Sequence, residues 1–189
     1  MLENLQLCRM KNNLKVSLVG YMGSGKSAVG LDLATKLNIP FIDLDSWIET
    51  KMNQSISELF KTLGEIKFRK LENESLLEIL QNESDFVLAT GGGTPVYYNN
   101  MSMIETLSES FYLRLNPSQL TERLINEKST RPLIAHIKDE DLPEFIAKHL
   151  FERRNFYEKA KYKLDVGPKS IQEISSEIIN LLNQDCLQK

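Results

Sequence analysis

The sequence is poor in cysteine and histidine, and this scarcity narrows the chemistry open to it. Its 189 residues include only two cysteines, Cys8 and Cys186, which lie in the two terminal segments and are too few for a disulfide framework. The two histidines, His136 and His149, have no nearby cysteine with which to complete a zinc site. We therefore expect neither a disulfide-stabilised fold nor a structural zinc centre.

Long apolar runs and a strong charge of one sign are missing as well. No apolar run approaches the length of a membrane span, and the N-terminus lacks the apolar region of a signal peptide. The formal net charge is only −3, and no basic stripe dominates the sequence. We expect a cytoplasmic protein whose partners include neither a membrane nor a nucleic acid.

The composition is that of one globular domain, with 41% hydrophobic and 26% charged residues. We expect residues 1–11 to form a tail and residues 12–189 to form the domain. Apolar runs alternate with helical patterns, which predicts an α/β fold with a parallel sheet. The predicted strands are residues 15–19, 40–43, 86–89, 110–113 and 162–166.

Three further segments complete the predicted organisation. A helical insert, about residues 44–81 and punctuated by Gly64, separates the second and third strands. Residues 127–143 are polar and contain two prolines, which in a compact domain is typical of either a functional lid or a disordered segment, and we expect a lid. The last helix begins at Ser170, where Glu173 completes a capping box, and it carries an apolar stripe that includes Ile171.

The most informative motif is Gly-Tyr-Met-Gly-Ser-Gly-Lys-Ser, from Gly20 to Ser27. It follows a predicted buried strand and opens a predicted helix, which is the setting that a phosphate-binding P-loop needs. Its glycines allow a tight turn whose N–H groups point into one hollow, while Lys26 reaches the β- and γ-phosphates and the Ser27 hydroxyl ligates Mg²⁺. A glycine-rich turn with an incidental lysine is the alternative, but strand, loop and helix agree on a nucleoside triphosphate site.

Two carboxylates follow the second predicted strand, in Phe41-Ile42-Asp43-Leu44-Asp45. The carboxyl ends of parallel strands face the ligand crevice, so one carboxylate suits a metal-linked role and the other a substrate role. The alternative is that Asp45 only caps the helix expected to begin near Ser46.

Arg69 has two possible roles. It can pair with Glu65 or Glu72 on the surface of a helix, or its planar guanidinium can bind a substrate carboxylate through two hydrogen bonds. Sequence spacing alone does not separate these alternatives.

Three consecutive glycines, Gly91, Gly92 and Gly93, follow the third predicted strand and allow a substrate to approach the backbone closely. Arg131 lies in the predicted lid, where it can neutralise charge on a transferring phosphoryl group or simply be solvated.

Arg153 and Arg154 are adjacent in the sequence, but on a helix their side chains point in different directions. The apolar stripe of the helix from Leu142 onward includes Arg153, whereas Arg154 lies about 100° away. An arginine on an inward-facing stripe needs an anion, so Arg153 is the better candidate for a substrate ligand.

Taken together, these motifs resemble those of the shikimate kinases. The resemblance runs from the first strand to the last helix and depends on the combination in this order: the P-loop, Phe41-x-Asp43-x-Asp45, Gly64-Glu65-x-x-Phe68-Arg69-x-x-Glu72, the three glycines, Arg131-Pro132-Leu133 and Arg153-x-x-x-Tyr157.

This resemblance implies a three-layer fold like that of nucleoside monophosphate kinases, with a five-stranded parallel sheet, a substrate-binding helical insert and a mobile lid. It implies phosphorylation of the 3-hydroxyl of shikimate by ATP with Mg²⁺, in the synthesis of chorismate and the aromatic amino acids, by a monomer. The residues that it implies for ATP are Gly23, Ser24, Gly25, Lys26, Ser27, Ala28, Arg123, Arg131 and Lys169.

For shikimate the resemblance implies Asp45, Arg69, the three glycines and Arg153, and for the metal Ser27 and Asp43. Lys26, Asp45 and Arg131 would be catalytic, with Asp45 acting either as a general base or only as a group that positions the hydroxyl. The chain departs from the family in having Asn155 where many relatives have a proline, and in a spacing of Arg123 that is offset by about one residue.

Two other functions compete with this interpretation. Another small-molecule P-loop kinase, such as a gluconate kinase, would share the fold without needing two arginines around one carboxylate. A catalytically silent nucleotide-binding module would be expected to have lost Lys26, Asp43 or Asp45, and all three are present.

Overall fold

The computed structural model describes residues 13–128 and 131–188. The expected tail at residues 1–11, which contains Cys8, lies outside these residues, and so does the side chain of Cys186. Within the described ranges, none of the helices combines the length and apolarity that crossing a membrane requires.

The centre of the molecule is a sheet of five parallel strands in the order β2-β3-β1-β4-β5. This confirms the predicted sheet, and the ends of the strands agree with the expected ones to within one residue. Buried aliphatic residues dominate the central strands, as is usual for parallel strands covered on both faces. The strands are β1 (Lys15–Val19), β2 (Phe41–Asp43), β3 (Phe86–Ala89), β4 (Glu109–Arg114) and β5 (Tyr162–Asp165).

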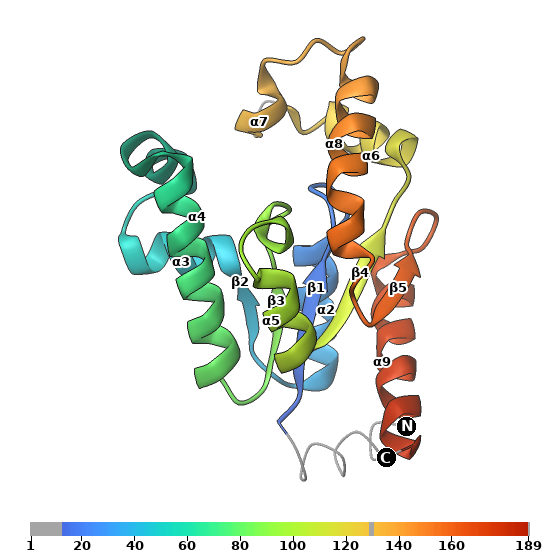
Figure 1. Ribbon diagram of the computed structural model, residues 1–189. Coiled ribbons are helices and arrows are strands. Elements are labelled where there is room, and N and C mark those ends of the chain that lie inside the picture. Colours follow the sequence, from blue (N-terminus) through green and yellow to red (C-terminus); the bar gives the residue numbers. More distant parts are fainter. Residues whose placement is uncertain (1–12, 129–130, 189) are drawn as a thin grey trace.

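Helices cover both faces of the sheet and extend beyond the carboxyl ends of its strands (Figure 1). Helices α2 and α9 pack together on one face, whereas α5 covers the other (Figure 1). Helices α3 and α4 lie beside β2, and α6, α7 and α8 lie beyond the strand ends (Figure 1). The helices are α2 (Lys26–Leu37), α3 (Leu44–Met52), α4 (Ile56–Asn82), the 3₁₀ turn η1 (Thr94–Val96), α5 (Asn100–Leu107), α6 (Pro117–Ile125), α7 (Pro132–Ala135), α8 (Leu142–Tyr157) and α9 (Ile171–Gln188).

The predicted helical insert consists of α3 and α4. Ser55 and Glu58 form a capping box at the start of α4, which fixes where the second helix begins. Gly64 interrupts α4 with φ 74° and ψ 167°, a conformation that a residue with a β-carbon rarely adopts. The helical insert is therefore kinked at Gly64, the position where the sequence predicted an interruption.

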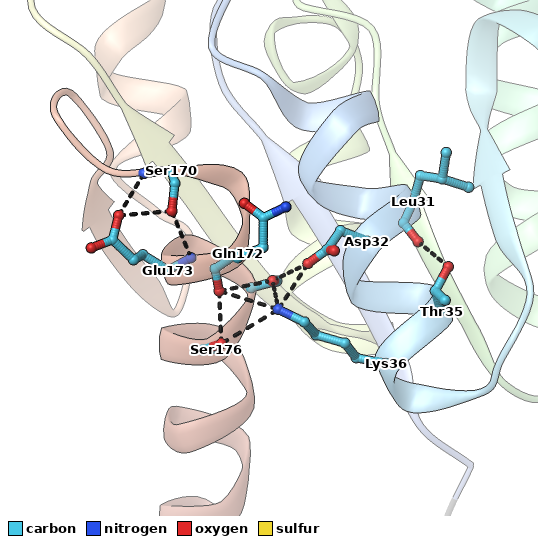
Figure 2. Close-up of polar contacts among 9 residues, drawn as sticks. Leu31, Asp32, Thr35, Lys36, Ser170, Gln172, Glu173 and Ser176 are labelled. Atoms are coloured by element: carbon cyan, nitrogen blue, oxygen red, sulfur yellow. Dashed lines mark hydrogen bonds and ion pairs between the residues drawn. The ribbon is translucent and has the colours of Figure 1, made fainter.

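Polar contacts join α9 to α2, the helix that follows the P-loop (Figure 2). The Lys36 ammonium lies 2.9 Å from an Asp32 carboxylate oxygen and donates to the Ser175 hydroxyl at 2.7 Å. Ser175 is fully buried and in turn donates to Asp32. At the start of α9 the predicted capping box between Ser170 and Glu173 is confirmed (Figure 2). These contacts fix the first turn of α9 beside the nucleotide-binding helix.

Candidate active site

The predicted P-loop connects β1 to α2 at the carboxyl edge of the sheet. Gly25 caps α2 in the left-handed conformation, with φ 91°, so that the loop turns directly into the helix. The Lys26 side chain is 8% exposed, and its ammonium donates to the carbonyl oxygens of Gly20 and Tyr21, both at 2.9 Å. The lysine is thus held inside the curve of the loop, where a bound phosphate would meet it.

Burial lowers the pKa of Lys26 to about 8. The carboxylates of Asp45 and Asp43 oppose this shift, whereas the Arg131 guanidinium adds to it. Lys26 therefore carries its charge at neutral pH but loses it more readily than an exposed lysine does.

Asp43, and not Asp45, caps helix α3. The helix begins at Leu44, and one oxygen of the Asp43 carboxylate accepts hydrogen bonds from the backbone N–H groups of Asp45 and Ser46. The alternative in which Asp45 is merely the cap is therefore wrong, because the helix starts two residues earlier than that alternative requires. The Asp45 carboxylate is therefore not used to cap α3, and it lines a cavity beside the P-loop.

The second oxygen of the Asp43 carboxylate accepts a hydrogen bond from the Ser27 hydroxyl at 2.7 Å. The two side chains predicted for the metal are therefore in contact, and both supply oxygen atoms, the ligands that Mg²⁺ prefers. No group of three or more histidine, cysteine or acidic side chains among the described residues could hold a metal ion. A cation at Ser27 and Asp43 would therefore complete its coordination with phosphate oxygens and water.

Asp45 lies at the meeting point of α3, β3 and the P-loop. An added β-carbon at Gly91 would lie 3.2 Å from one of its carboxylate oxygens. Burial raises the pKa of Asp45 to about 6, and the neighbouring charges of Asp43 and Glu72 add to the effect while Lys26 opposes it. A carboxylate with this pKa can accept a proton near neutral pH.

The three glycines form a tightly packed floor after β3. A β-carbon at Gly92 would lie 3.1 Å from the backbone nitrogen of Met22 in the P-loop, and one at Gly93 would lie 3.0 Å from the Arg69 guanidinium. Gly91 is equally restricted, with the Thr94 hydroxyl 2.9 Å from the same position. Side chains are excluded here because the P-loop, Asp45 and Arg69 all approach the same stretch of backbone.

Arg69 lies beside Gly93, and both of its candidate partners, Glu65 and Glu72, are close to its guanidinium. Its guanidinium donates to the Glu72 carboxylate at 2.9 Å and lies 3.8 Å from Glu65. It also lies over the Tyr97 ring, 4.3 Å from the ring centroid. Glu72 is only 1% exposed, and its other oxygen accepts from Thr94 at 2.7 Å. The ion pair is therefore buried and holds Arg69 in place, so that ion pairing and ligand binding are compatible roles.

Arg153 and Arg154 point in different directions, as the helical period predicted. Arg153 is half-buried, and its charge lowers the pKa values of both Tyr21 and Tyr157, against the stronger effect of burial. Burial and the hydrogen bond to Glu65 raise the pKa of Tyr97, and the charges of Arg69 and Arg153 both oppose that rise. Arg154 is exposed and donates to Glu158 at 3.1 Å.

A cavity of about 560 Å³ lies between the P-loop and the segment that carries Glu127 and Arg131. Arg131 borders it and donates to Glu127 at 2.9 Å, and Arg123 borders it between the carbonyl oxygens of Gly23, at 3.4 Å, and Gly167, at 3.3 Å. The residues that line the cavity are Met22, Gly23, Gly25, Lys26, Ser27, Ala28, Asp43, Asp45, Thr90, Gly91, Gly92, Arg123, Glu127, Arg131 and Ile171.

Five predicted site residues are not among those that line this cavity, and the first of them, Ser24, is buried within the P-loop. Gly93, Arg69 and Arg153 belong to the adjoining region around Tyr97, and Lys169 instead donates to Glu177 at 2.6 Å. Ile171, expected in the apolar stripe of the last helix, is 39% exposed and borders the cavity where Lys169 was predicted.

Sequence reasoning assigned no site role to Tyr97 or Tyr21. Tyr97 follows η1 and donates to Glu65 at 2.7 Å beneath Arg69. Its position just after the three glycines was the one available signal. Tyr21 is 1% exposed and contacts His149, which is 128 residues away in the chain, so no local pattern could reveal that contact.

The arrangement combines a phosphate-binding loop, an oxygen pair suited to a divalent cation, and a region with two arginines and a buried carboxylate. The first two parts can hold a nucleoside triphosphate with its metal. The third suits a small acceptor that carries both an anionic group and hydroxyl groups.

Known proteins are similar to this chain in sequence and in fold. The family model described as "Shikimate kinase" matches residues 22–183. A shikimate kinase of Flavobacterium johnsoniae is 44% identical over 169 residues, which cover 89% of this chain and 98% of that protein. The crystal structure of shikimate kinase from Bacteroides thetaiotaomicron is 36% identical, with a TM-score of 0.84 over 89% of this chain and 98% of that one. Shikimate kinase from Acinetobacter baumannii, in complex with shikimate, is 29% identical, with a TM-score of 0.83 over 94% of this chain and 98% of that one.

Proposed function

The chain belongs to the shikimate kinase family, and from this membership we propose that it transfers the γ-phosphoryl group of ATP to the 3-hydroxyl of shikimate. The products are shikimate 3-phosphate and ADP, in the route to chorismate and the aromatic amino acids. The observation that carries the proposal is the presence, at the carboxyl edge of the sheet, of a complete P-loop beside the glycine floor that Arg69 borders.

The reaction forms one bond and breaks one. The oxygen of the shikimate hydroxyl attacks the γ-phosphorus of ATP, and the bond from that phosphorus to the bridging oxygen breaks as ADP leaves. We propose that Asp45 accepts the hydrogen bond of the attacking hydroxyl and then takes its proton. Its position beside Gly91 and its raised pKa support this role.

For the nucleotide, we propose that the backbone from Gly23 to Ala28 binds the phosphates, while Lys26 and Arg131 counter the negative charge that moves during transfer. Ser27 and Asp43 would hold Mg²⁺, which, when bound, neutralises phosphate charge. Arg123, between the P-loop and the segment before α9, would border the adenine. A part for Lys169 at the nucleotide stays a prediction.

For shikimate, we propose that Arg69 and Arg153 bind the carboxylate and that the backbone of Gly91, Gly92 and Gly93 forms the floor. The two terminal nitrogens of the Arg69 guanidinium would lie 3.0 Å from a β-carbon at Gly93, which supports a ligand between this arginine and the glycine floor. The buried pair with Glu72 keeps the guanidinium plane fixed, so less conformational entropy is lost when the substrate binds.

We also propose that residues 127–143 act as a lid that brings Arg131 to the phosphates and excludes water. The cytoplasm as location and the monomer as functional form belong to the same proposal. They rest on the family resemblance.

The roles of Asp45 and Lys26 predict a bell-shaped pH dependence of kcat/KM. Below about pH 6 Asp45 is protonated and cannot accept the hydroxyl proton, so activity falls. Above about pH 8 Lys26 loses the charge that attracts the phosphates, so activity falls again. Initial rates at low substrate concentration across this range test the prediction. A flat profile between pH 5 and pH 9 would contradict it.

The adjacent arginines of α8 supply a matched pair of variants. We expect Arg153→Ala to raise the KM for shikimate by about 20-fold or more, because a charged hydrogen bond to the carboxylate is lost, and to leave the KM for ATP nearly unchanged. Arg154→Ala removes an exposed arginine and should change neither constant. Steady-state kinetics with each substrate varied in turn decide the matter, and equal effects of the two variants would refute the assignment.

The acceptor is tested by ADP release from Mg-ATP in a coupled assay, with and without candidate acceptors. Shikimate-dependent ADP release supports the proposal. Turnover with gluconate or with nucleoside monophosphates, and none with shikimate, would favour the related small-molecule kinases. ATP binding without turnover of any of these acceptors would retain the P-loop function and refute the proposed acceptor.

A further inference from the structure

One buried contact between the P-loop and α8 is not used by the reaction described above. The Tyr21 hydroxyl lies 2.8 Å from Nδ1 of His149, and the two rings meet edge to face with their centroids 5.6 Å apart. Tyr21 is 1% exposed, and His149 is half-buried. This contact is expected to be retained in the folded state, because breaking it leaves the buried Tyr21 hydroxyl without a partner or water.

The protonation states of the two groups allow the Tyr21 hydroxyl to donate to Nδ1 of His149. Burial, and then the charge of Arg153, lowers the pKa of His149 to about 4, so the imidazole is neutral at neutral pH. Burial raises the pKa of Tyr21 above its usual value, so the hydroxyl keeps its proton. We assign the tautomer protonated on Nε2, in which the hydroxyl of Tyr21 donates and Nδ1 of His149 accepts.

His149, Arg153 and Tyr157 follow each other at intervals of four residues and so lie along one face of α8. At the far end of this series, the Tyr157 hydroxyl donates to the carbonyl oxygen of Gly92 at 2.5 Å. Arg153 is therefore bracketed on its helix by two hydrogen bonds, one to the P-loop through Tyr21 and one to the glycine floor.

The anchor on the P-loop side is itself rigid. The carbonyl oxygen of Tyr21 accepts from the Lys26 ammonium at 2.9 Å, and the backbone of Tyr21 and Met22 packs against Gly92. Movement of His149 away from Tyr21 would therefore shift Arg153 relative to the floor, with little direct effect on the phosphate-binding backbone.

We propose that Tyr21 and His149 form a positioning pair, whose hydrogen bond holds α8 against the P-loop and so places Arg153 to receive the carboxylate of the acceptor. This inference rests on the proposed function, because it takes shikimate as the source of the carboxylate. A contact that only stabilises the core would change the melting temperature without separating the two Michaelis constants.

The test uses Tyr21→Phe, His149→Leu, the double variant and His149→Asn in the full-length protein. We expect Tyr21→Phe and His149→Leu each to raise the KM for shikimate about fivefold, the effect of one lost hydrogen bond between neutral groups. The KM for ATP should stay within about twofold, and the double variant should match the single ones, since both remove the same contact. His149→Asn places an amide oxygen near the position of Nδ1 and should restore most of the affinity.

Phe151→Ala is the control on the same helix, because Phe151 is 80% exposed and has no part in the site. An equal or larger rise in the KM for ATP, additive effects in the double variant, or unchanged kinetics would each overturn the inference. If His149→Leu does not fold, Tyr21→Phe, which removes one oxygen atom, and His149→Asn still decide it.

A nitrogen-15 spectrum of the imidazole separates this inference from the proposed function. If the wild-type protein does not phosphorylate shikimate, the proposed function fails, and the spectrum then decides whether the pair exists. A neutral His149 protonated on Nε2, whose Nδ1 signal shifts in Tyr21→Phe, supports the pair. An imidazole protonated on Nδ1 at neutral pH, or a signal that Tyr21→Phe does not change, would overturn it.

Discussion

Replacing Lys26 by methionine is expected to lower kcat by about 100-fold or more, because it removes a charge that stabilises the transferring phosphoryl group. In the folded protein the ammonium is buried and is held by the carbonyl oxygens of Gly20 and Tyr21, inside the loop that would receive the phosphates. Electrostatic stabilisation is strong at such a site because water is largely excluded. Methionine keeps most of the side-chain volume, so the main change is the lost charge.

The measurement is kcat at saturating shikimate and Mg-ATP, with Lys70→Met as the control. Lys70 is adjacent to Arg69 in the sequence, but its side chain is 72% exposed. Its replacement should therefore leave kcat unchanged. A Lys26→Met protein that is folded, by circular dichroism, and turns over at the wild-type rate would contradict the catalytic role.

Replacing Asp45 by asparagine is expected to lower kcat by about 100-fold or more as well, because a general base contributes a factor of this size. Asparagine can still accept a hydrogen bond from the hydroxyl but cannot take its proton at neutral pH. A loss confined to the KM for shikimate would instead mean that Asp45 only positions the hydroxyl.

The same substitution should not destabilise the protein. The pKa of Asp45 is about 6 in the folded state, against 3.8 for an unperturbed aspartate, so ionisation at pH 7 disfavours folding. Asparagine removes that penalty, and the difference disappears as the pH falls below 3.8, where the carboxyl is neutral in both states. Thermal unfolding at pH 7 should therefore show an equal or higher melting temperature, with exposed Glu74→Gln as the control.

Much of this arrangement could be predicted because it depends on local patterns. The P-loop spacing identified Lys26 and Ser27, and helical periodicity separated Arg153 from Arg154 before any contact was known. The alternation of apolar runs and helical patterns predicted the five-stranded parallel sheet, which the structure confirms.

The remaining features depend on contacts between distant segments. The alternative in which Asp45 only caps α3 stayed open in the sequence, and it is excluded by the hydrogen bonds that Asp43 accepts from the backbone of Asp45 and Ser46. A surface ion pair between Arg69 and Glu72 was likewise one of two alternatives, and the structure buries Glu72 between Thr94 and Arg69. Spacing on one helix cannot report what packs over it from another part of the chain.

The central claim is the transfer of a phosphoryl group from ATP to the 3-hydroxyl of shikimate. Its most direct test is a phosphorus and proton nuclear magnetic resonance spectrum of the protein with Mg-ATP and shikimate. We predict that ADP and one new phosphomonoester appear in equal amounts, with the new phosphorus signal coupled to the proton on carbon 3 of the ring. No new phosphomonoester, or one coupled to another ring proton, would contradict the account.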